Sequence, residues 1–163
     1  MLYVAYVQGG RELTFLEQLK IIGIKAYCPR QMAAERRRGE WIYVERIIFG
    51  CYVFVEAEEI TPEFWLRVHS CTGFIRFLSR CSLAPTEEEY IRLLCNNGEC
   101  IEVSRGYISN GMLHITDGFL RKLEHRIIRF NRRGKRASAD VTMYGEHYKV
   151  VFSVEFDNPP VSS

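Results

Sequence analysis

The pattern of the sequence changes at Asn96-Asn97-Gly98, and this change constrains the fold more than any other feature. Before it, apolar residues recur at strand spacing and at helix spacing in turn. After it, short strand-like pieces alternate with glycine-containing turns. Because Asn-Gly pairs mark turns and boundaries, the sequence predicts two domains, residues 1–95 and 104–163, joined by a linker at 96–103.

Residues 1–95 alternate between predicted strands and predicted helices. Residues 30–40 are polar and are expected to form a loop or the tip of a hairpin. The order of the elements predicts an α/β sandwich on a mostly antiparallel sheet, within an α+β protein. Strands are predicted at 2–8, 24–27, 41–44, 47–55 and 73–78, and helices at 13–22, after Thr61-Pro62 and after the capping box Thr86-Glu87-Glu88-Glu89.

Residues 104–163 predict a small β-barrel of about 50–60 residues. Residues 119–130 fit a helical face as well as strands, so their structure stays ambiguous by periodicity. The predicted strands are Met112–Thr116, Glu124–Phe130, Ala137–Met143 and Tyr148–Phe156.

The net charge of +2 conceals a basic cluster in the second half of the chain. Residues 121–136 hold eight bases against the single acid Glu124, which suggests a polyanionic partner. The alternative is a solvated basic face. The bases around Gly134 and the pair Arg121-Lys122 are expected on adjacent loops at one end of the barrel, where they could form one surface. The eight bases are Arg121, Lys122, Arg126, Arg129, Arg132, Arg133, Lys135 and Arg136.

The sequence offers little to support an enzyme. It contains no HExxH, no GxSxG and no phosphate-binding glycine loop, so no catalytic residue, metal site or cofactor is predicted. The six cysteines are interpreted as reduced thiols of a cytoplasmic protein. No apolar run approaches the roughly 20 residues of a membrane span, and no membrane partner is expected.

The segment 47–55 is apolar almost throughout, so both of its faces should seek cover. Tyr52 and Phe54 share one face, and Val53 and Val55 share the other. The aromatic face is either core beneath a second element or an exposed patch for a partner. From these residues alone, core is the favoured interpretation.

Several segments resemble the N-terminal (NGN) domain of the NusG family of transcription factors. Ile47–Val55, which reads IIFGCYVFV, resembles the PLFPGYVFV strand of that domain, with Gly50-Cys51 in place of Pro-Gly. The opening LYVAYVQGG resembles its WYVV…G start, with Leu2 in place of Trp. Further matches are Gly23–Pro29, Thr72–Phe77 and Leu83-Ala84-Pro85.

The second half resembles a KOW domain, an SH3-like small β-barrel that follows the NGN domain in this family. Ile115–Gly118 matches its start. Asp117–Glu124 and Arg132–Ala137 are most similar to the specialised antiterminators of the LoaP type, although Phe119 replaces a proline and Lys122 and His125 replace glycines. In the related RfaH branch the C-terminal domain is helical when docked on the NGN domain; the valines of residues 141–154 favour strands here instead.

The resemblance implies a transcription elongation and antitermination factor that performs no bond chemistry. Docking on the clamp helices of RNA polymerase would suppress pausing and termination, and the KOW domain would bind an RNA hairpin. A ribosomal protein or another elongation factor is a further implied partner of this cytoplasmic monomer. The competing interpretation is a KOW-type RNA-binding protein of the ribosome or translation machinery. The implied polymerase contacts are Tyr6, Phe49, Tyr52 and Phe54; the implied RNA contacts are Arg121, Lys122, Arg129, Arg132, Arg133, Lys135, Arg136 and Lys149, with Arg36, Arg37 and Arg38 as nucleic-acid contacts of the NGN domain.

Overall fold

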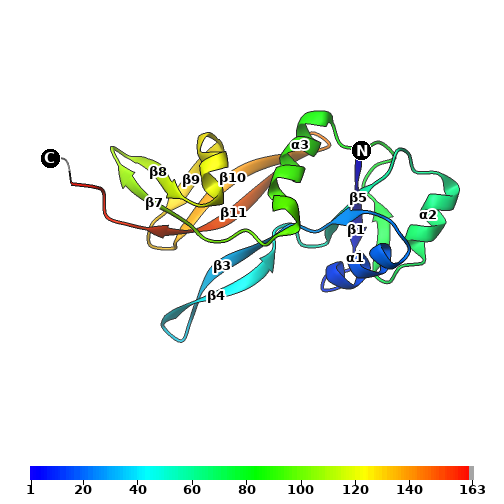
Figure 1. Ribbon diagram of the computed structural model, residues 1–163, viewed down its shortest axis with the longest axis horizontal. Helices are drawn as coiled ribbons and strands as arrows, with labels where there is room; N and C mark the ends of the chain where they lie inside the picture. The colour runs from blue at the N-terminus through cyan, green and yellow to red at the C-terminus, as the bar shows by residue number, and fades with distance from the viewer. Residues whose placement is uncertain (162–163) are drawn as a thin grey trace. The chain divides into compact units, whose positions relative to one another are not determined.

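The computed structural model describes residues 1–161 and is a mixed α+β protein of two compact units (Figure 1). The first unit comprises residues 1–29, 47–99 and 142–146. The second comprises residues 30–46, 100–141 and 147 onwards. The chain passes from the first unit to the second between Glu99 and Cys100, inside the segment predicted as a linker. Residues 30–46, which precede this point in the sequence, also belong to the second unit.

The first unit is built on a four-stranded sheet in the order β2-β5-β1-β6. Its strand pairs are antiparallel, and β1 pairs with β5 in the register Val4↔Phe54 and Tyr6↔Tyr52. A short 3-10 turn, η1, follows the last helix. The elements are β1 (Leu2–Val7), α1 (Glu12–Ile21), β2 (Ala26–Tyr27), β5 (Tyr52–Glu56), α2 (Pro62–His69), β6 (Phe74–Phe77), α3 (Pro85–Leu94) and η1 (Asn96–Gly98).

Helices cover both faces of this sheet. Successive strand residues point to opposite faces, and the side chains on both faces are apolar, so each face needs a covering layer. Val53 and Val55 pack in one cluster with Phe15 and Leu19 of α1 and with Val68 of α2. On the opposite face, Leu2, Val4 and Phe54 are fully buried. Arg92 of α3 bonds to Glu56 of that face at 2.6 Å, and Figure 1 shows α3 on the side of the sheet away from α1 and α2.

The second unit is built on a five-stranded sheet in the order β8-β7-β11-β10-β9, with a 3-10 helix, η2, before β9. β7 and β11 are parallel, whereas β7 with β8 and β9 with β10 are antiparallel. Its core contains Leu120 and Leu123 of η2 and Phe152 of β11. The elements are β7 (Ser104–Ser109), β8 (Met112–Asp117), η2 (Phe119–Arg126), β9 (Ile127–Asn131), β10 (Arg136–Met143) and β11 (Glu146–Phe156).

A two-stranded hairpin of β3 (Arg30–Arg37) and β4 (Glu40–Ile47) folds with this second unit. The backbone N–H of Ala34 donates to the Ser153 hydroxyl at 2.8 Å, and the Gln31 amide donates to the carbonyl of Val151 at 2.7 Å. Ile101, buried inside the predicted linker, exchanges backbone hydrogen bonds with Arg30 and Met32. A fragment beginning at residue 104 would therefore lose part of the unit's packing.

The predicted elements are confirmed where their periodicity is regular and wrong where turns interrupt it. Residues 47–55 are not one strand: the chain turns at 48–51, where Cys51 has a positive φ, and only 52–56 are β5. Of the two structures predicted for residues 30–40, the loop is wrong, because these residues hold all of β3, whereas the hairpin tip is confirmed by the turn at 38–39 between β3 and β4. β7 has no counterpart among the predicted strands, and residues 119–130 divide into η2 and β9.

The two predicted helix starts have different outcomes. The hydroxyl of Thr61 accepts from the backbone N–H of Phe64 at 3.1 Å and caps α2, with Pro62 in the first turn, as predicted. α3 begins at Pro85 instead of after Thr86, with Ala84 as its N-cap. The Glu87 carboxylate accepts from the backbone N–H of Ala84 at 3.2 Å and so supplies half of a capping box without a capping hydroxyl.

Candidate nucleic-acid interface

Four arginines lie together at the β9 edge of the second unit; they are Arg129, Arg132, Arg133 and Arg136, here called the basic strip. β9 is an edge strand, and it pairs with β10 in the register Arg129↔Ser138 and Asn131↔Arg136. Side chains two residues apart on a strand share a face, so Arg129 and Arg136 point to the same side of the sheet. Arg132 and Arg133 lie in the turn that joins the two strands.

The basic strip is exposed and nearly free of acidic neighbours. Within residues 1–161, Arg129, Arg133 and Arg136 make no ion pair. Arg132 donates to the Asn158 side-chain oxygen at 3.3 Å, which leaves its charge uncompensated. Unpaired guanidinium groups on one edge can bind phosphate without first breaking a salt bridge.

Arg121 and Lys122 lie at the other end of β9, on η2. The prediction that they share one end of the barrel with the turn at 132–135 is wrong, because the five residues of β9 separate them. Both side chains are exposed, and the Lys122 ammonium lies 5.4 Å from the centre of the Phe119 ring.

Lys135 is occupied inside the second unit. Its ammonium bonds to both carboxylate oxygens of Glu155 at 2.9 and 3.0 Å and lies 5.1 Å from the centre of the Trp41 ring. The Tyr43 hydroxyl donates to the same carboxylate. Burial raises the pKa of Glu155, but Tyr43 and Lys135 outweigh it and hold the pKa below its ordinary value. Glu155 thus ties the 132–135 turn to β4.

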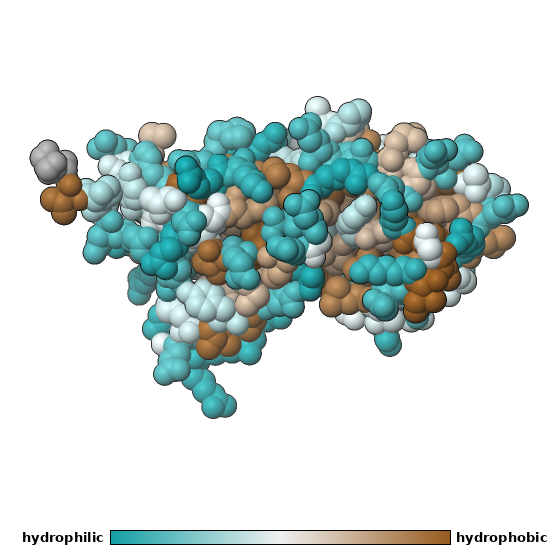
Figure 2. Space-filling view, in the orientation of Figure 1, coloured by the Kyte–Doolittle hydropathy of each residue, from teal (hydrophilic) through white to brown (hydrophobic). Residues whose placement is uncertain are grey.

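The tip of the β3–β4 hairpin carries Arg36, Arg37 and Arg38, here called the hairpin arm, and all three are exposed. In Figure 2 hydrophilic side chains cover this end of the hairpin. Arg37 bonds to Glu35 at 2.9 Å, and Arg46 bonds to the same carboxylate at 2.7 Å. The Arg36 guanidinium lies 5.6 Å from the centre of the Trp41 ring. The hairpin arm was predicted to belong to the N-terminal domain, whereas residues 30–46, which include it, fold with the second unit.

Lys149 is exposed on β11, on the strand face that also holds Ser153 and Glu155. That face carries the contacts of Ser153 and Glu155 with the β3–β4 hairpin. Three residues of this region, Trp41, Tyr43 and Glu155, were not predicted from the sequence. Only the proximity of Trp41 to the arginines at 36–38 in the sequence could have signalled the first of them.

The four predicted polymerase contacts divide into two buried and two half-buried side chains. Phe49 and Phe54 pack edge to face at 5.6 Å and are 5% and 0% exposed, so both lie in the core. Tyr6 and Tyr52 stand opposite each other on β1 and β5, with ring centres 6.0 Å apart, and are half-buried. The Arg76 guanidinium lies 5.6 Å from the Tyr6 ring and completes a row across the sheet.

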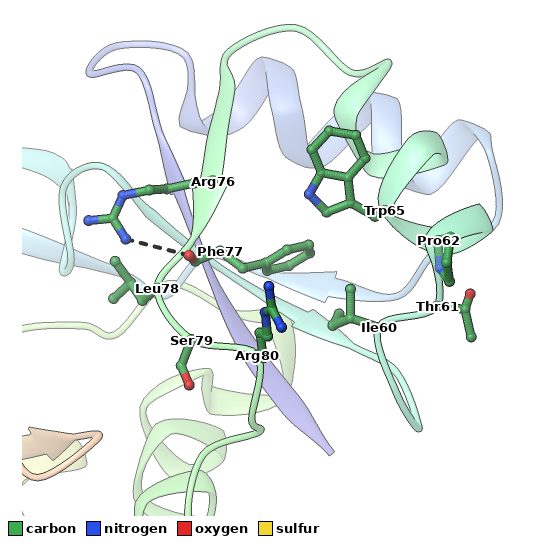
Figure 3. Close-up of a pocket in the computed structure, with 9 residues that line it drawn as sticks. All are labelled: Ile60, Thr61, Pro62, Trp65, Arg76, Phe77, Leu78, Ser79 and Arg80. Atoms are coloured by element: carbon green, nitrogen blue, oxygen red, sulfur yellow. Dashed lines mark hydrogen bonds between the residues drawn. The ribbon is translucent and has the colours of Figure 1, made fainter.

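A surface pocket of about 590 Å³ lies in the first unit between α2 and the end of β6 with the segment that follows it, and Arg76 belongs both to its lining and to the row (Figure 3). Figure 3 shows Arg80 pointing between Phe77 and Ile60, while Arg76 points away from Trp65. The lining offers an indole and guanidinium groups, which can bind a ligand but supply no acid–base pair. The lining residues are Ile60, Thr61, Pro62, Trp65, Arg76, Phe77, Leu78, Ser79 and Arg80.

The remaining chemistry of the described chain is modest. All six cysteines are free thiols, and burial raises the pKa of Cys95 to about 12, which keeps that thiol protonated and unreactive. None of the helices in residues 1–161 is long and apolar enough to cross a membrane. No protein-family model matches this chain, and no curated protein matches it.

Proposed function

We propose that this protein is a NusG-family transcription elongation and processive antitermination factor, whose second unit binds an RNA hairpin and whose first unit docks on RNA polymerase. In this proposal the first unit is the NGN domain and the second, with its curled sheet, is the KOW domain. The observation that carries the proposal is the basic strip: four exposed arginines on one sheet edge, among them three without an ion pair in residues 1–161.

RNA suits this surface because its charges are arginines on an exposed edge. Arginine binds phosphate with two parallel N–H donors and can also stack on an unpaired base. Ile128, 66% exposed between the charged positions, adds an apolar contact of the kind that a splayed base could cover. Arg121 and Lys122 extend the positive surface to the other end of β9, so a bound strand could follow the edge. Lys135 is bonded to Glu155, so in this proposal it holds the 132–135 turn in place and does not bind phosphate itself.

Replacing Arg132 and Arg133 together by glutamine should weaken RNA binding and change its salt dependence. Each lost phosphate contact removes about 0.7–0.9 from the slope of log K against log[salt], so we expect the slope to flatten by about 1.5. Gel-shift titrations at several salt concentrations measure this slope. The matched control is Lys20→Gln with Lys25→Gln, two exposed lysines of the first unit that give the same change in net charge. Equal slopes for the two double variants would leave the basic strip as a solvated face.

Docking of the first unit would use the half-buried row of Tyr52, Tyr6 and Arg76. Two aromatic rings beside a guanidinium are typical of the centre of a protein interface. Phe54 follows Tyr52 on the same face of β5 and packs against Phe49; both phenylalanines are buried and would support the row without touching the partner. A factor held across the polymerase cleft in this way would keep the clamp closed, which requires binding energy but no chemical step.

Tyr52→Ala should weaken polymerase binding about tenfold or more while costing only about 1–2 kcal/mol of unfolding free energy, because the ring is half-buried. A fully buried aromatic would cost about 3–5 kcal/mol, which is the result we expect for Phe54→Ala. Thermal melts and pull-downs of RNA polymerase and ribosomes with the same variants make the comparison. Capture of ribosomes and not polymerase by the unmodified chain would favour a translation factor and overturn the docking proposal.

A further inference from the structure

The hairpin arm is far in the sequence from the 132–135 turn, which carries Arg132 and Arg133 of the basic strip. Both belong to the second unit, and Arg36 of the arm and Lys135 of the turn lie beside the indole of Trp41. We propose that the β3–β4 hairpin is a second arm of the RNA site, and that Trp41 stacks on an unpaired base of single-stranded RNA running between the two arginine groups. This inference rests on the proposed RNA-binding function and adds to it a stacking residue and the path of the strand.

Trp41 is flanked by one cation of the hairpin arm and by one cation of the 132–135 turn. Arg36 of the hairpin lies 5.6 Å from the ring centre, and Lys135 of the 132–135 turn lies 5.1 Å from it. The Lys135 ammonium is fixed by two bonds to Glu155, so the turn and its arginines stay beside the indole. Arg36 is exposed and makes no ion pair within the described chain. One neighbour of the ring is therefore fixed and the other is free to move.

Displacement of the Arg36 guanidinium from the Trp41 ring by an RNA base is favourable, because the base makes the stronger contact with the ring. The cation–π contact of an exposed arginine such as Arg36 is weak, whereas stacking of a base on an aromatic side chain changes affinity by roughly 5- to 100-fold. The displaced guanidinium then lies next to the phosphate of the stacked nucleotide. Binding thus replaces one weak contact with a stacking contact and a charged hydrogen bond.

The turn of the β3–β4 hairpin holds an arginine, Arg38, at a position whose backbone conformation disfavours a long side chain. Arg38 and Gly39 have φ values of 51° and 79°, the pattern of a two-residue type I′ turn. Asparagine or glycine is preferred at the first of these positions, because a longer side chain is strained at positive φ. An arginine there costs stability and places a positive charge at the outermost point of the arm, next to Arg37.

The test uses the full chain with Trp65→Phe, which leaves Trp41 as the single tryptophan. A fluorescein-labelled 12-nucleotide oligouridylate is titrated, with anisotropy of the label reporting binding and Trp41 emission, recorded with unlabelled RNA, reporting stacking. We expect Trp41 quenching with the same midpoint as the anisotropy change. Binding without quenching would overturn the stacking role and leave the proposed RNA-binding function standing. The absence of binding by either signal would overturn the stacking role and the path for single-stranded RNA, while the gel-shift titrations with an RNA hairpin decide separately whether the proposed function stands.

The second measurement separates charge from folding. Arg38→Asn suits the turn better than arginine, so its melting temperature should equal or exceed that of the unmodified chain. Its affinity for the oligouridylate should fall about fivefold at 100 mM salt, the effect of one lost phosphate contact. Arg38→Lys, which keeps the charge, should bind as the unmodified chain does. Unchanged affinity of Arg38→Asn, with Arg132→Gln/Arg133→Gln still weakened, would remove the hairpin arm from the site.

Discussion

Gly118→Ala should destabilise the second unit by about 3–5 kcal/mol. Gly118 has φ 104° and ψ −179°, a region of backbone space that is essentially restricted to glycine. A Cβ at this position would lie 2.6 Å from the Ser104 hydroxyl oxygen and 2.8 Å from the Ser104 Cα. That hydroxyl is buried and accepts from the backbone N–H of Leu120 at 3.0 Å, so the substitution also breaks the contact that starts η2.

Gly111→Ala is the matched control in the same unit. Gly111 also has a positive φ, 73°, but a Cβ there would meet no atom within 4 Å. We therefore expect a loss of only about 1 kcal/mol, the cost of the backbone conformation alone. Denaturant unfolding followed by Trp41 emission in a Trp65→Phe background reports the second unit. Equal losses for the two variants would show that the close approach to Ser104 does not contribute.

Glu87→Ala should cost the first unit about 3 kcal/mol or more, because it removes the acceptor of three backbone donors. The Glu87 carboxylate accepts from the N–H groups of Tyr144 and Gly145 at 3.1 Å each, besides that of Ala84. The Tyr144 hydroxyl donates to the Cys81 carbonyl at 2.9 Å, and burial raises the pKa of this tyrosine to about 12. One carboxylate therefore fixes both the start of α3 and the 144–145 turn.

The contribution of Glu87 should depend on pH in a defined direction. Burial raises the pKa of Glu87, but the N–H donors of Gly145, Ala84 and Tyr144 outweigh it and leave the pKa below its ordinary value. A lowered folded-state pKa means that the unfolded chain binds the proton first. The stabilisation is therefore complete above the unfolded-state pKa of about 4.3 and is lost as pH falls through the folded-state value.

Two further variants, Glu87→Gln and Glu89→Ala, test this direction. The difference in unfolding free energy between the unmodified chain and Glu87→Gln should be constant near neutral pH and should shrink below about pH 4. Glu89→Ala, an exposed acid in the same helix, should change stability by less than about 0.5 kcal/mol. Trp65 emission in a Trp41→Phe background follows the first unit. A Glu87→Gln difference that grows in acid would mean that the carboxylate is not held by these donors.

The N-terminal elements could be predicted because their side chains face two well-defined environments. The continuous apolar run Leu2–Val7 reflects burial on both faces of one sheet, and Phe15 and Leu19 of α1 cover one of these faces. β3 could not be predicted in the same way. Only Gln31 and Ala34 are buried along it, so its sequence carries no apolar alternation. Its pairing with β4, and its hydrogen bonds to residues more than 100 positions away, hold it extended.

The arginines of the candidate site were visible in the sequence, but their grouping was not. Periodicity gives no indication that residues 30–46 fold with the C-terminal half, because the contacts that bring them there involve single residues such as Ser153 and Glu155. The same tertiary contacts decide that Lys135 is an internal tie while Arg133 is exposed. Of the two residues on the aromatic face, Phe54 is buried, as the interpretation as core predicted, whereas Tyr52 is half-buried.

Competition binding of the full chain measures the central claim most directly. A labelled RNA hairpin with a loop of unpaired bases is bound at 100 mM salt and displaced either by the same unlabelled hairpin or by duplex DNA with an equal number of phosphates. Charge alone would treat these two competitors alike, whereas arginines that stack on unpaired bases distinguish them. We predict that the duplex DNA displaces the labelled hairpin at least tenfold less effectively. Equal displacement by the two competitors would contradict RNA recognition by the basic strip.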